Sequence, residues 1–202
     1  MVFVKIKNPQ HQDSPDACVP VCIKGILKSQ FNVDRRISAI KKWLKYIKGS
    51  GVTSPYMVPN RLEEPLSSLG IIPLVKSSAG SEDLKKLLKD GILPFILLRP
   101  TYINETGIKK IKVYEGGEEW FHCIVVCGFD EENEKVYIYD PLLSYSGGEL
   151  NEGNCQVKIP YALLAKYWKE TNNKLFWLAS QKGRPKEKNA LLQSFFNDGG
   201  EN

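Results

Sequence analysis

Residues 120–141 read WFHCIVVCGFDEENEKVYIYDP and predict two antiparallel strands joined by a polar hairpin loop. Apolar residues fill the first strand, 120–129, as is typical of a buried strand, and the returning strand spans 136–139. Antiparallel pairing brings the two open ends of a hairpin together. We therefore expect His122, near the start of the first strand, and Asp140, just after the second, at the same end of the hairpin.

The rest of the chain divides into a helical first part and a strand-rich second part. Apolar residues at helical spacing predict helices over residues 16–27, 37–47, 58–69, 81–88 and 160–169. Short apolar or alternating runs predict further strands over residues 2–6, 71–75, 95–98, 108–114 and 174–179. Because helices and strands are segregated along the chain, we expect the α+β class, with the N-terminal helical part packed on a C-terminal antiparallel β-sheet.

Length and composition are those of one globular domain. The 202 residues are 42% hydrophobic and 25% charged, so the chain can bury a core without metal or disulfide support. We expect this domain to span residues 1–181, followed by a basic and polar tail, 182–202, that is partly disordered or forms a short docking helix. The net charge of +5 comes from lysines spread along the chain, with no arginine-rich arm, which argues against a nucleic-acid partner.

Cysteine usage and targeting signals predict a soluble cytoplasmic protein. The five cysteines are an odd number, which is typical of reduced thiols. Residues 1–9 lack the apolar segment of a signal peptide. The longest apolar run, 92–98, is interrupted by Pro94 and is too short to span a bilayer. Nothing in the pattern indicates the oligomeric state.

Cys18 is the first candidate for a catalytic residue. It lies where a loop, residues 10–16, meets the start of a predicted helix, and the unpaired N–H groups and dipole of a helix start stabilise a thiolate. Gln12, six residues upstream, is placed to supply a side-chain amide to an oxyanion hole beside the backbone N–H of Cys18. Taken alone, a cysteine is more often a small core residue, and a loop glutamine is usually solvated.

His122 and Asp140 carry the other groups that a cysteine nucleophile needs. His122 is one of only two histidines in the sequence, and imidazole is the usual base near neutral pH. Asp140 is placed to orient the imidazole and to fix its tautomer. Each residue also has an ordinary structural explanation, since a histidine at a strand start is often a satisfied core residue and an Asp-Pro pair often starts a turn.

The combination of these residues carries a family resemblance. Its segments are Gln12 followed after five residues by Cys18-Val19-Pro20, the strand 91–98 with its Gly and Pro, the strand 122–128, and residues 137–141. In order and spacing they resemble the C39-like cysteine peptidases of the papain-like fold, over roughly residues 2–177. The resemblance implies that Cys18 is the nucleophile and His122 the general base and then acid. It implies further that Asp140 orients His122, that Gln12 is the oxyanion donor, that no cofactor is needed, and that the partner is a peptide or protein substrate.

One residue departs from the family pattern, in which glycine usually follows the catalytic cysteine. Val19 stands at that position, and a β-branched side chain there narrows the site or alters the approach of the substrate. A catalytically weak or inactive domain that binds proteins is therefore an alternative, as are deamidation and transpeptidation, which use the same groups. The family also includes peptidases that act on bacteriocin leaders at a Gly-Gly pair, usually fused to a transporter. This sequence has no transporter segment, so that substrate is not carried over.

A zinc site is the chemical alternative that the cysteine spacing raises. Cys18 with Cys22, and Cys123 with Cys127, have a superficially suitable separation. Residues four apart on a strand, however, lie roughly 13 Å apart and cannot share one ion whose bonds to sulfur are about 2.3 Å long. We therefore expect no metal.

Long irregular connections at residues 50–60 and 101–117 are candidate walls of a substrate groove. Trp120 and Tyr139 flank the strands that carry the candidate residues. Both aromatic residues are predicted to belong to the core, with a role in lining the groove as the alternative.

Overall fold

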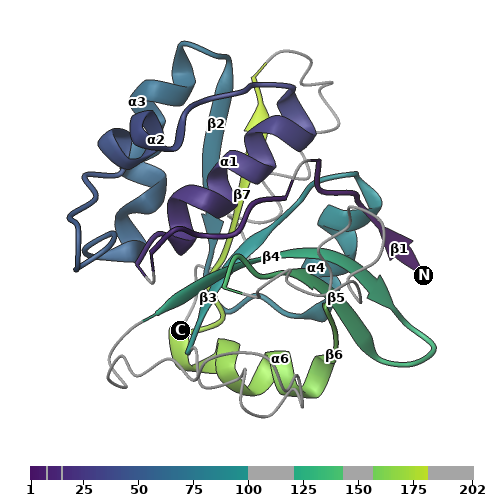
Figure 1. Ribbon diagram of the computed structural model, residues 1–202. Helices are drawn as coiled ribbons and strands as arrows, with labels where there is room; N and C mark the ends of the chain where they lie inside the picture. Colours follow the sequence, from purple (N-terminus) through teal and green to yellow (C-terminus); the bar gives the residue numbers. More distant parts are fainter. Residues whose placement is uncertain (8, 15, 100–120, 143–156, 182–202) are drawn as a thin grey trace, which may run out of the picture.

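The computed structural model describes residues 1–7, 9–14, 16–99, 121–142 and 157–181 (Figure 1). Its helices are α1 (Cys18–Phe31), α2 (Ile37–Trp43), α3 (Val58–Ser67), α4 (Ser81–Lys89) and α6 (Tyr161–Trp168), with 3₁₀ turns η1 (Pro55–Met57) and η2 (Lys169–Thr171). Its strands are β1 (Val2–Phe3), β2 (Ile71–Lys76), β3 (Phe95–Leu98), β4 (His122–Asp130), β5 (Lys135–Tyr139), β6 (Val157–Pro160) and β7 (Leu175–Ser180). The predicted strand 108–114 and the predicted tail 182–202 lie outside the described residues.

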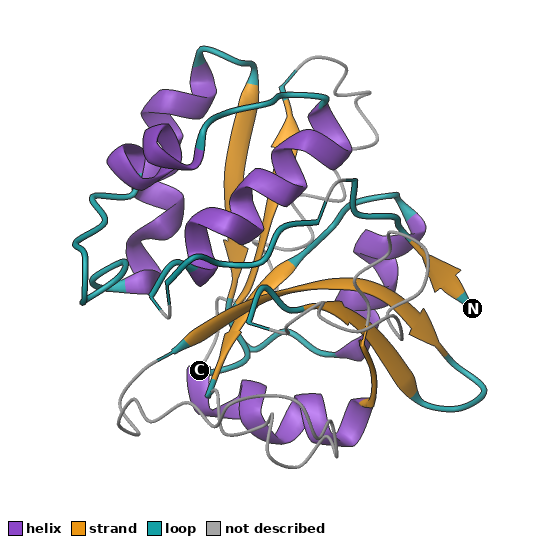
Figure 2. Cartoon of the chain, in the orientation of Figure 1, coloured by secondary structure: helices purple, strands orange, loops and turns teal. Residues whose placement is uncertain are grey.

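These strands pair antiparallel in the order β2-β7-β3-β4-β5-β6, and β1 joins the far end of β4. Helices lie on both sides of the sheet (Figure 2), and the sheet separates two apolar clusters. Along β4, Cys123 and Val125 belong to the cluster that α1 and α3 cover, whereas Ile124 and Val126 belong to the cluster that α4 and α6 cover. The predicted α+β class, with a helical part packed on an antiparallel sheet, is confirmed.

The predicted elements differ from the observed ones mainly at their ends. The helix predicted over 37–47 ends at Trp43, because Lys45 takes a left-handed backbone (φ 52°) and the chain then turns back on itself between Ile47 and Gly51. The strand predicted over 2–6 pairs only over Val2–Phe3. Strand β6 was not predicted, because only two of its four residues are buried and its pattern is too short to stand out.

Gly128 allows β1 to cross close to β4. A Cβ atom at this position would lie 2.7 Å from the Val2 carbonyl oxygen and 2.8 Å from the Phe3 ring. The pairing of β4 with β5 shifts register between Val126 and Gly128, which is the mark of a β-bulge. The glycine in this strand is therefore required by the close approach of a second backbone.

Candidate active site

Helix α1 begins at Cys18, two residues later than predicted. The residue before it, Ala17, makes no side-chain capping bond. No side chain at the N-cap therefore covers the first backbone N–H groups of the helix, where the helix dipole is positive. Pro20 is accommodated in this first turn because its missing N–H would have no partner within the helix. Cys18 keeps 6% of its surface exposed, whereas Cys22 and Cys123 keep none.

His122 and Asp140 form a buried pair, with 2.6 Å between His122 Nε2 and Asp140 Oδ1. The β4–β5 register explains the contact. Val125 lies opposite Tyr139, so the next residue, Asp140, falls beside Ile124 and diagonally across from His122 on the same side of the strands. The predicted meeting of these two side chains at the open end of the hairpin agrees with this geometry.

The Asp140 carboxylate is held from its own side as well. Its Oδ1 accepts a hydrogen bond of 2.7 Å from the backbone N–H of Leu142, which is the turn that the Asp-Pro pair predicts. The same oxygen thus fixes the turn and the His122 ring. One conformation of Asp140 can therefore both start the turn and orient the His122 ring.

The surroundings of His122 favour its charged form. Burial by itself lowers the pKa of His122, but the Asp140 carboxylate outweighs it, and the Cys18 side chain adds a hydrogen bond and a charge contribution, so that the pKa rises to about 10. Cys18 is therefore a polar neighbour of His122. The structure thus places Asp140 in contact with His122 and Cys18 near the same imidazole.

Gln12 is buried in the loop that leads to Cys18. Its backbone N–H donates to the Pro141 carbonyl oxygen at 2.9 Å, and its side-chain Nε2 donates to the Ser14 carbonyl oxygen at 2.9 Å. The first bond attaches this loop to the residue that follows Asp140. Gln12 is therefore not a solvated loop residue, and it is fixed to the strand end that carries the third candidate.

Tyr139 fixes the same loop two residues earlier. Its ring is completely buried, as predicted for a core residue, while its hydroxyl donates to the Gln10 carbonyl oxygen and accepts from the Gln10 N–H at 3.1 Å. No local sequence signal marks this contact, because the two residues are 129 positions apart. The other flanking aromatic residue, Trp120, lies outside the described residues.

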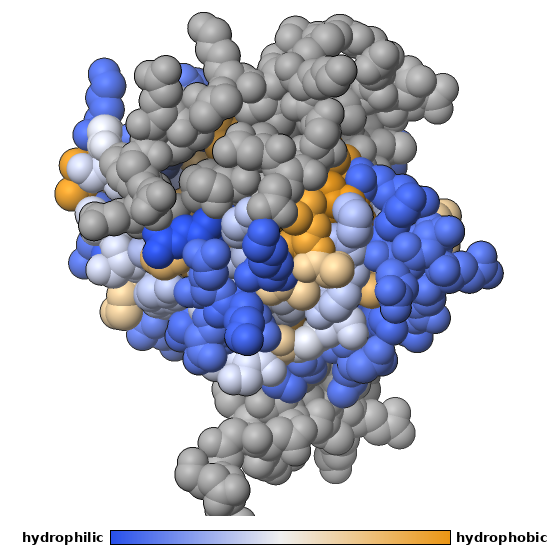
Figure 3. All heavy atoms as spheres, turned by 90° about the horizontal axis from the view of Figure 1, so that it is seen from below, coloured by the Kyte–Doolittle hydropathy of each residue, from blue (hydrophilic) through white to orange (hydrophobic). Residues whose placement is uncertain are grey.

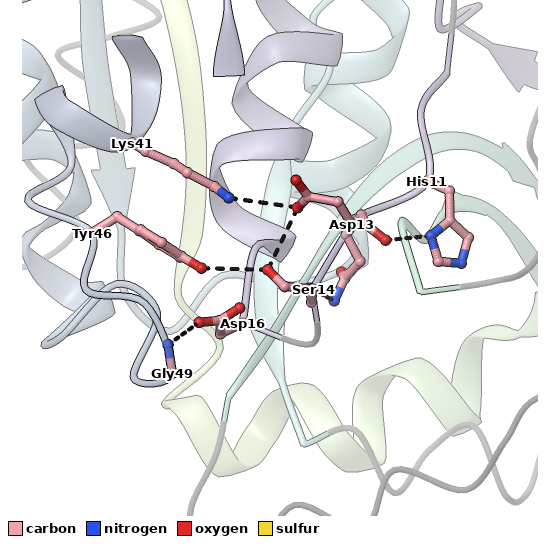
Figure 4. Close-up of polar contacts among 8 residues, drawn as sticks. His11, Asp13, Ser14, Asp16, Lys41, Tyr46 and Gly49 are labelled. Carbon is pink, nitrogen blue, oxygen red and sulfur yellow. Dashed lines mark hydrogen bonds and ion pairs between the residues drawn. The ribbon is translucent and has the colours of Figure 1, made fainter. Parts of the chain in front are cut away.

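A second contact that the sequence does not reveal holds the other side of the loop. Asp16 Oδ2 accepts a hydrogen bond of 2.6 Å from the Gly49 N–H, and Ser14 contacts the Tyr46 hydroxyl (Figure 4). Burial raises the pKa of Asp16, but the hydrogen bonds from Ser14, Tyr46 and Gly49 outweigh it and lower the pKa below its ordinary value. The segment before Cys18 is thus tied to the loop after α2 as well as to β5.

The remaining described cysteines are thiols of the core. Cys22, Cys123 and Cys127 are buried and unbridged, and the Cys22 thiol donates to the Cys123 carbonyl oxygen at 3.3 Å. Burial, with Cys123 beside it, raises the pKa of Cys22 well above its ordinary value. In the described part of the chain, no three His, Cys, Asp or Glu side chains gather in a way that could hold a metal ion. None of the helices described is long and apolar enough to cross a membrane.

Comparison with known proteins adds a family and several similar folds. A model of the Peptidase C39-like family matches residues 9–175. A C39-like peptidase from Bacillus anthracis has 15% identity and a TM-score of 0.56, with 89% of this chain and 98% of that chain covered. The peptidase domain of Streptococcus ComA, a bifunctional ABC transporter of a quorum-sensing pathway, has 17% identity and a TM-score of 0.54, with 88% and 98% covered.

A double-glycine-motif protease from an AMS/PCAT transporter, solved with its leader peptide, has 15% identity and a TM-score of 0.52, with 89% of this chain and 99% of that chain covered. At these identities the solved structures show the fold, and they confirm that it is the papain-like fold of C39-like peptidase domains. No curated protein matches the sequence. The family match spans most of the residues that form the core and the candidate site, and the chain belongs to the C39-like peptidase family.

Proposed function

We propose that the chain is a cysteine peptidase that hydrolyses a peptide or isopeptide bond with Cys18 as nucleophile. The observation that carries this proposal is the buried His122–Asp140 pair at 2.6 Å, and Cys18 is near enough to the same imidazole to raise the pKa of His122 further. Acyl transfer through a thioester needs a nucleophile, a base beside it and a group that orients the base. Membership of a peptidase family agrees with this reaction.

The reaction follows from the bonds at His122. Because Nε2 bonds Asp140, Nδ1 is the ring nitrogen left for the Cys18 proton. The Cys18 thiolate attacks the carbonyl carbon, the C–N bond breaks, and His122 gives its proton to the leaving amine. His122 then takes one proton from water, whose oxygen attacks the thioester; Cys18 leaves as thiolate and the product as a carboxylic acid, which gives its remaining proton to solvent. Asp140 keeps the ring aligned through both steps.

Gln12 is the proposed oxyanion donor beside the backbone N–H of Cys18. Its side-chain nitrogen carries two hydrogens, one of which bonds the Ser14 carbonyl oxygen. The backbone bond of Gln12 to Pro141 supports this role because it fixes the loop at a constant distance from the strand end. Donors that are fixed before the reaction stabilise a developing negative charge without reorganising.

Val19 does not weigh against catalysis. Its side chain is 4% exposed and packs in the apolar cluster that α1 shares with β4. It therefore contributes to the apolar core and leaves little of its own surface exposed. This supports an active enzyme over the inactive binding domain. Deamidation and transpeptidation differ from peptidase action only in the amide attacked or the acceptor used.

Domain and compartment are part of the proposal. We assign residues 1–181 to the peptidase domain and treat 182–202 as a tail. The four cysteines among the described residues are buried and unbridged, which supports a reducing compartment such as the cytoplasm. The proposed partner is a peptide or protein substrate.

Selective alkylation tests the nucleophile. Iodoacetamide at near-neutral pH, followed by peptide mass spectrometry, is expected to modify Cys18 faster than free cysteine and much faster than Cys22 or Cys123. The His122→Ala variant should lose this selectivity. Slow and equal labelling of several cysteines would support the inactive binding domain instead.

A cleavage profile on a proteome-derived peptide library tests the reaction. Wild type and Cys22→Ala should yield the same new termini, and Cys18→Ala should yield none while unfolding at the same temperature as wild type. Cys22 is the matched control, since it lies one turn further along α1. Cleavage by Cys18→Ala at the wild-type rate would contradict the assignment.

A further inference from the structure

An exposed aromatic and aliphatic patch lies directly beside the candidate site. Tyr56 and Met57, on η1, keep 37% and 45% of their surface exposed. The Tyr56 ring meets the Phe121 ring edge to face at 5.6 Å between centroids, and Phe121 immediately precedes His122. In Figure 1 the chain before α3 approaches the start of β4. Much of the described surface is hydrophilic, as the face in Figure 3 illustrates, so adjacent exposed apolar groups indicate a binding role.

The patch adjoins the nucleophile through the core. Phe121 packs against the apolar cluster that contains Cys18, Val52 and Val58. It therefore lies on the side of β4 that faces α1 and α3, between the helical part and the sheet. Phe121 thus belongs to the same half of the fold as Cys18 and directly precedes His122, so a peptide bound at the candidate site is expected to extend toward these rings.

Two cations border the rings. The Arg99 guanidinium lies 4.9 Å from the Phe121 centroid, and the Lys174 ammonium lies 5.0 Å from the Tyr56 centroid. Arg99 is paired with Glu170 at 3.0 Å, whereas among the described residues no carboxylate forms an ion pair with Lys174. The balance of these three charges is therefore positive. An acidic group of a ligand would complement it, and the aromatic faces hold the cations near the rings.

We propose that Tyr56, Met57 and Phe121 form a subsite for an aromatic or large aliphatic side chain of the peptide substrate, and that Lys174 selects an acidic residue next to it. This inference rests on the proposed peptidase function and names its substrate class. The occupant is an extended peptide in which an apolar residue near the scissile bond adjoins Asp or Glu.

Binding to an inactive variant tests the subsite apart from catalysis. Cys18→Ala protein is incubated with an array of random-sequence synthetic peptides, and the enriched residues are read out. The expected enrichment is an aromatic or large aliphatic residue beside Asp or Glu. Adding Tyr56→Ala should weaken binding of the enriched peptides about tenfold, the scale on which apolar pockets discriminate. Adding Lys174→Gln should remove the acidic preference and keep the apolar one.

Matched controls separate the patch from general surface effects. Ile47→Ala removes another exposed apolar side chain, and Lys166→Gln removes another cation over a ring, 4.9 Å from Tyr167. Both should bind like the parent. Binding without an apolar preference, binding unchanged by Tyr56→Ala, or no binding above background would each overturn the subsite.

Cleavage by the wild type decides the proposed function separately. Cleavage that shows no apolar preference would overturn the subsite and leave the peptidase assignment standing. Array binding that requires Tyr56, without any cleavage by the wild type, would support the subsite and contradict the peptidase.

Discussion

The backbone N–H of Gln12 donates to the carbonyl oxygen of Pro141 at 2.9 Å, so the loop before the nucleophile is bonded to the residue after Asp140. Tyr139, the residue before Asp140, holds Gln10 in the same loop through both backbone groups. The segment that ends β5 therefore carries the proposed orienting carboxylate and also positions the proposed oxyanion donor. Two parts of the site that are distant in sequence are set by one short stretch of chain.

Tyr139→Phe tests this coupling. The variant keeps the buried ring and removes both hydrogen bonds to Gln10, so the loop should become less well positioned. We expect a loss of stability of about 1 kcal/mol, typical of a neutral hydrogen bond, and a several-fold fall in kcat with little change in KM. Steady-state kinetics and urea unfolding measure the two effects.

The control for this variant lies on the same strand. Tyr137→Phe removes a hydroxyl from a partly exposed ring that packs edge to face on Phe3, away from the loop. Its kcat should equal that of wild type. An unchanged kcat in Tyr139→Phe, together with the expected loss of stability, would make Tyr139 a structural residue without a positioning role.

Asp140→Asn tests the orienting role. In the wild type the Leu142 N–H donates to the Asp140 carboxylate at 2.7 Å, and the amide oxygen of Asn can still accept this bond. A neutral amide does not, however, stabilise an imidazolium as a carboxylate does. We expect kcat to fall about 10²- to 10⁴-fold, the range for loss of a working acid–base group. In a His122→Ala background the same substitution should have little further effect, because the two residues act as a unit. Additive losses would show that Asp140 acts independently of His122.

The parts of the site that could be predicted from the sequence are those that depend on local pattern and on strand pairing. His122 and Asp140 could be placed together because one hairpin register determines their positions, and Cys18 because a helix start is visible in the sequence. The contacts of Tyr139 with Gln10 and of Asp16 with Gly49 join residues 129 and 33 positions apart. Such contacts depend on how α1, β5 and the loop after α2 pack, which no periodicity encodes. Of the candidate groove segments, 50–60 contains the Tyr56–Met57 pair, and 101–117 lies outside the described residues.

The raised pKa of His122 predicts a stability that depends on pH. Its folded-state pKa is about 10 against an ordinary value of 6.5. A raised pKa stabilises the fold fully below the unfolded value, and this contribution is lost as pH rises through the folded value. The free energy of unfolding should therefore fall between about pH 6.5 and pH 10 by more in Cys18→Ala protein than in Cys18→Ala/Asp140→Asn protein. The Cys18→Ala background removes the neighbouring thiol from both proteins, and with it the part of the raised His122 pKa that Cys18 contributes, so the fall ends somewhat below pH 10.

Urea unfolding at one-unit steps of pH measures the difference between the two proteins. The two curves should converge toward pH 10, because the charge that Asp140 stabilises is then lost. Parallel curves would mean that Asp140 does not hold a proton on His122.

Gly128→Ala tests the close crossing of β1 over β4. The added methyl would lie 2.7 Å from the Val2 carbonyl oxygen and 2.8 Å from the Phe3 ring, so one strand must move. Overpacking of this kind costs about 1–3 kcal/mol. Since both contacts belong to the two residues of β1, we expect β1 to separate from β4 while the rest of the sheet stays paired.

Removing residues 1–3 supplies the control, because it deletes the atoms that the methyl would meet. In the truncated protein Gly128→Ala should cost much less stability than in the full chain. The kcat should stay near its wild-type value in both, since His122 lies six residues along β4, roughly 20 Å away at 3.3 Å per residue. An equal loss of stability with and without residues 1–3 would place the strain in the β4–β5 bulge, where Tyr137 is the next neighbour of the glycine at 3.2 Å.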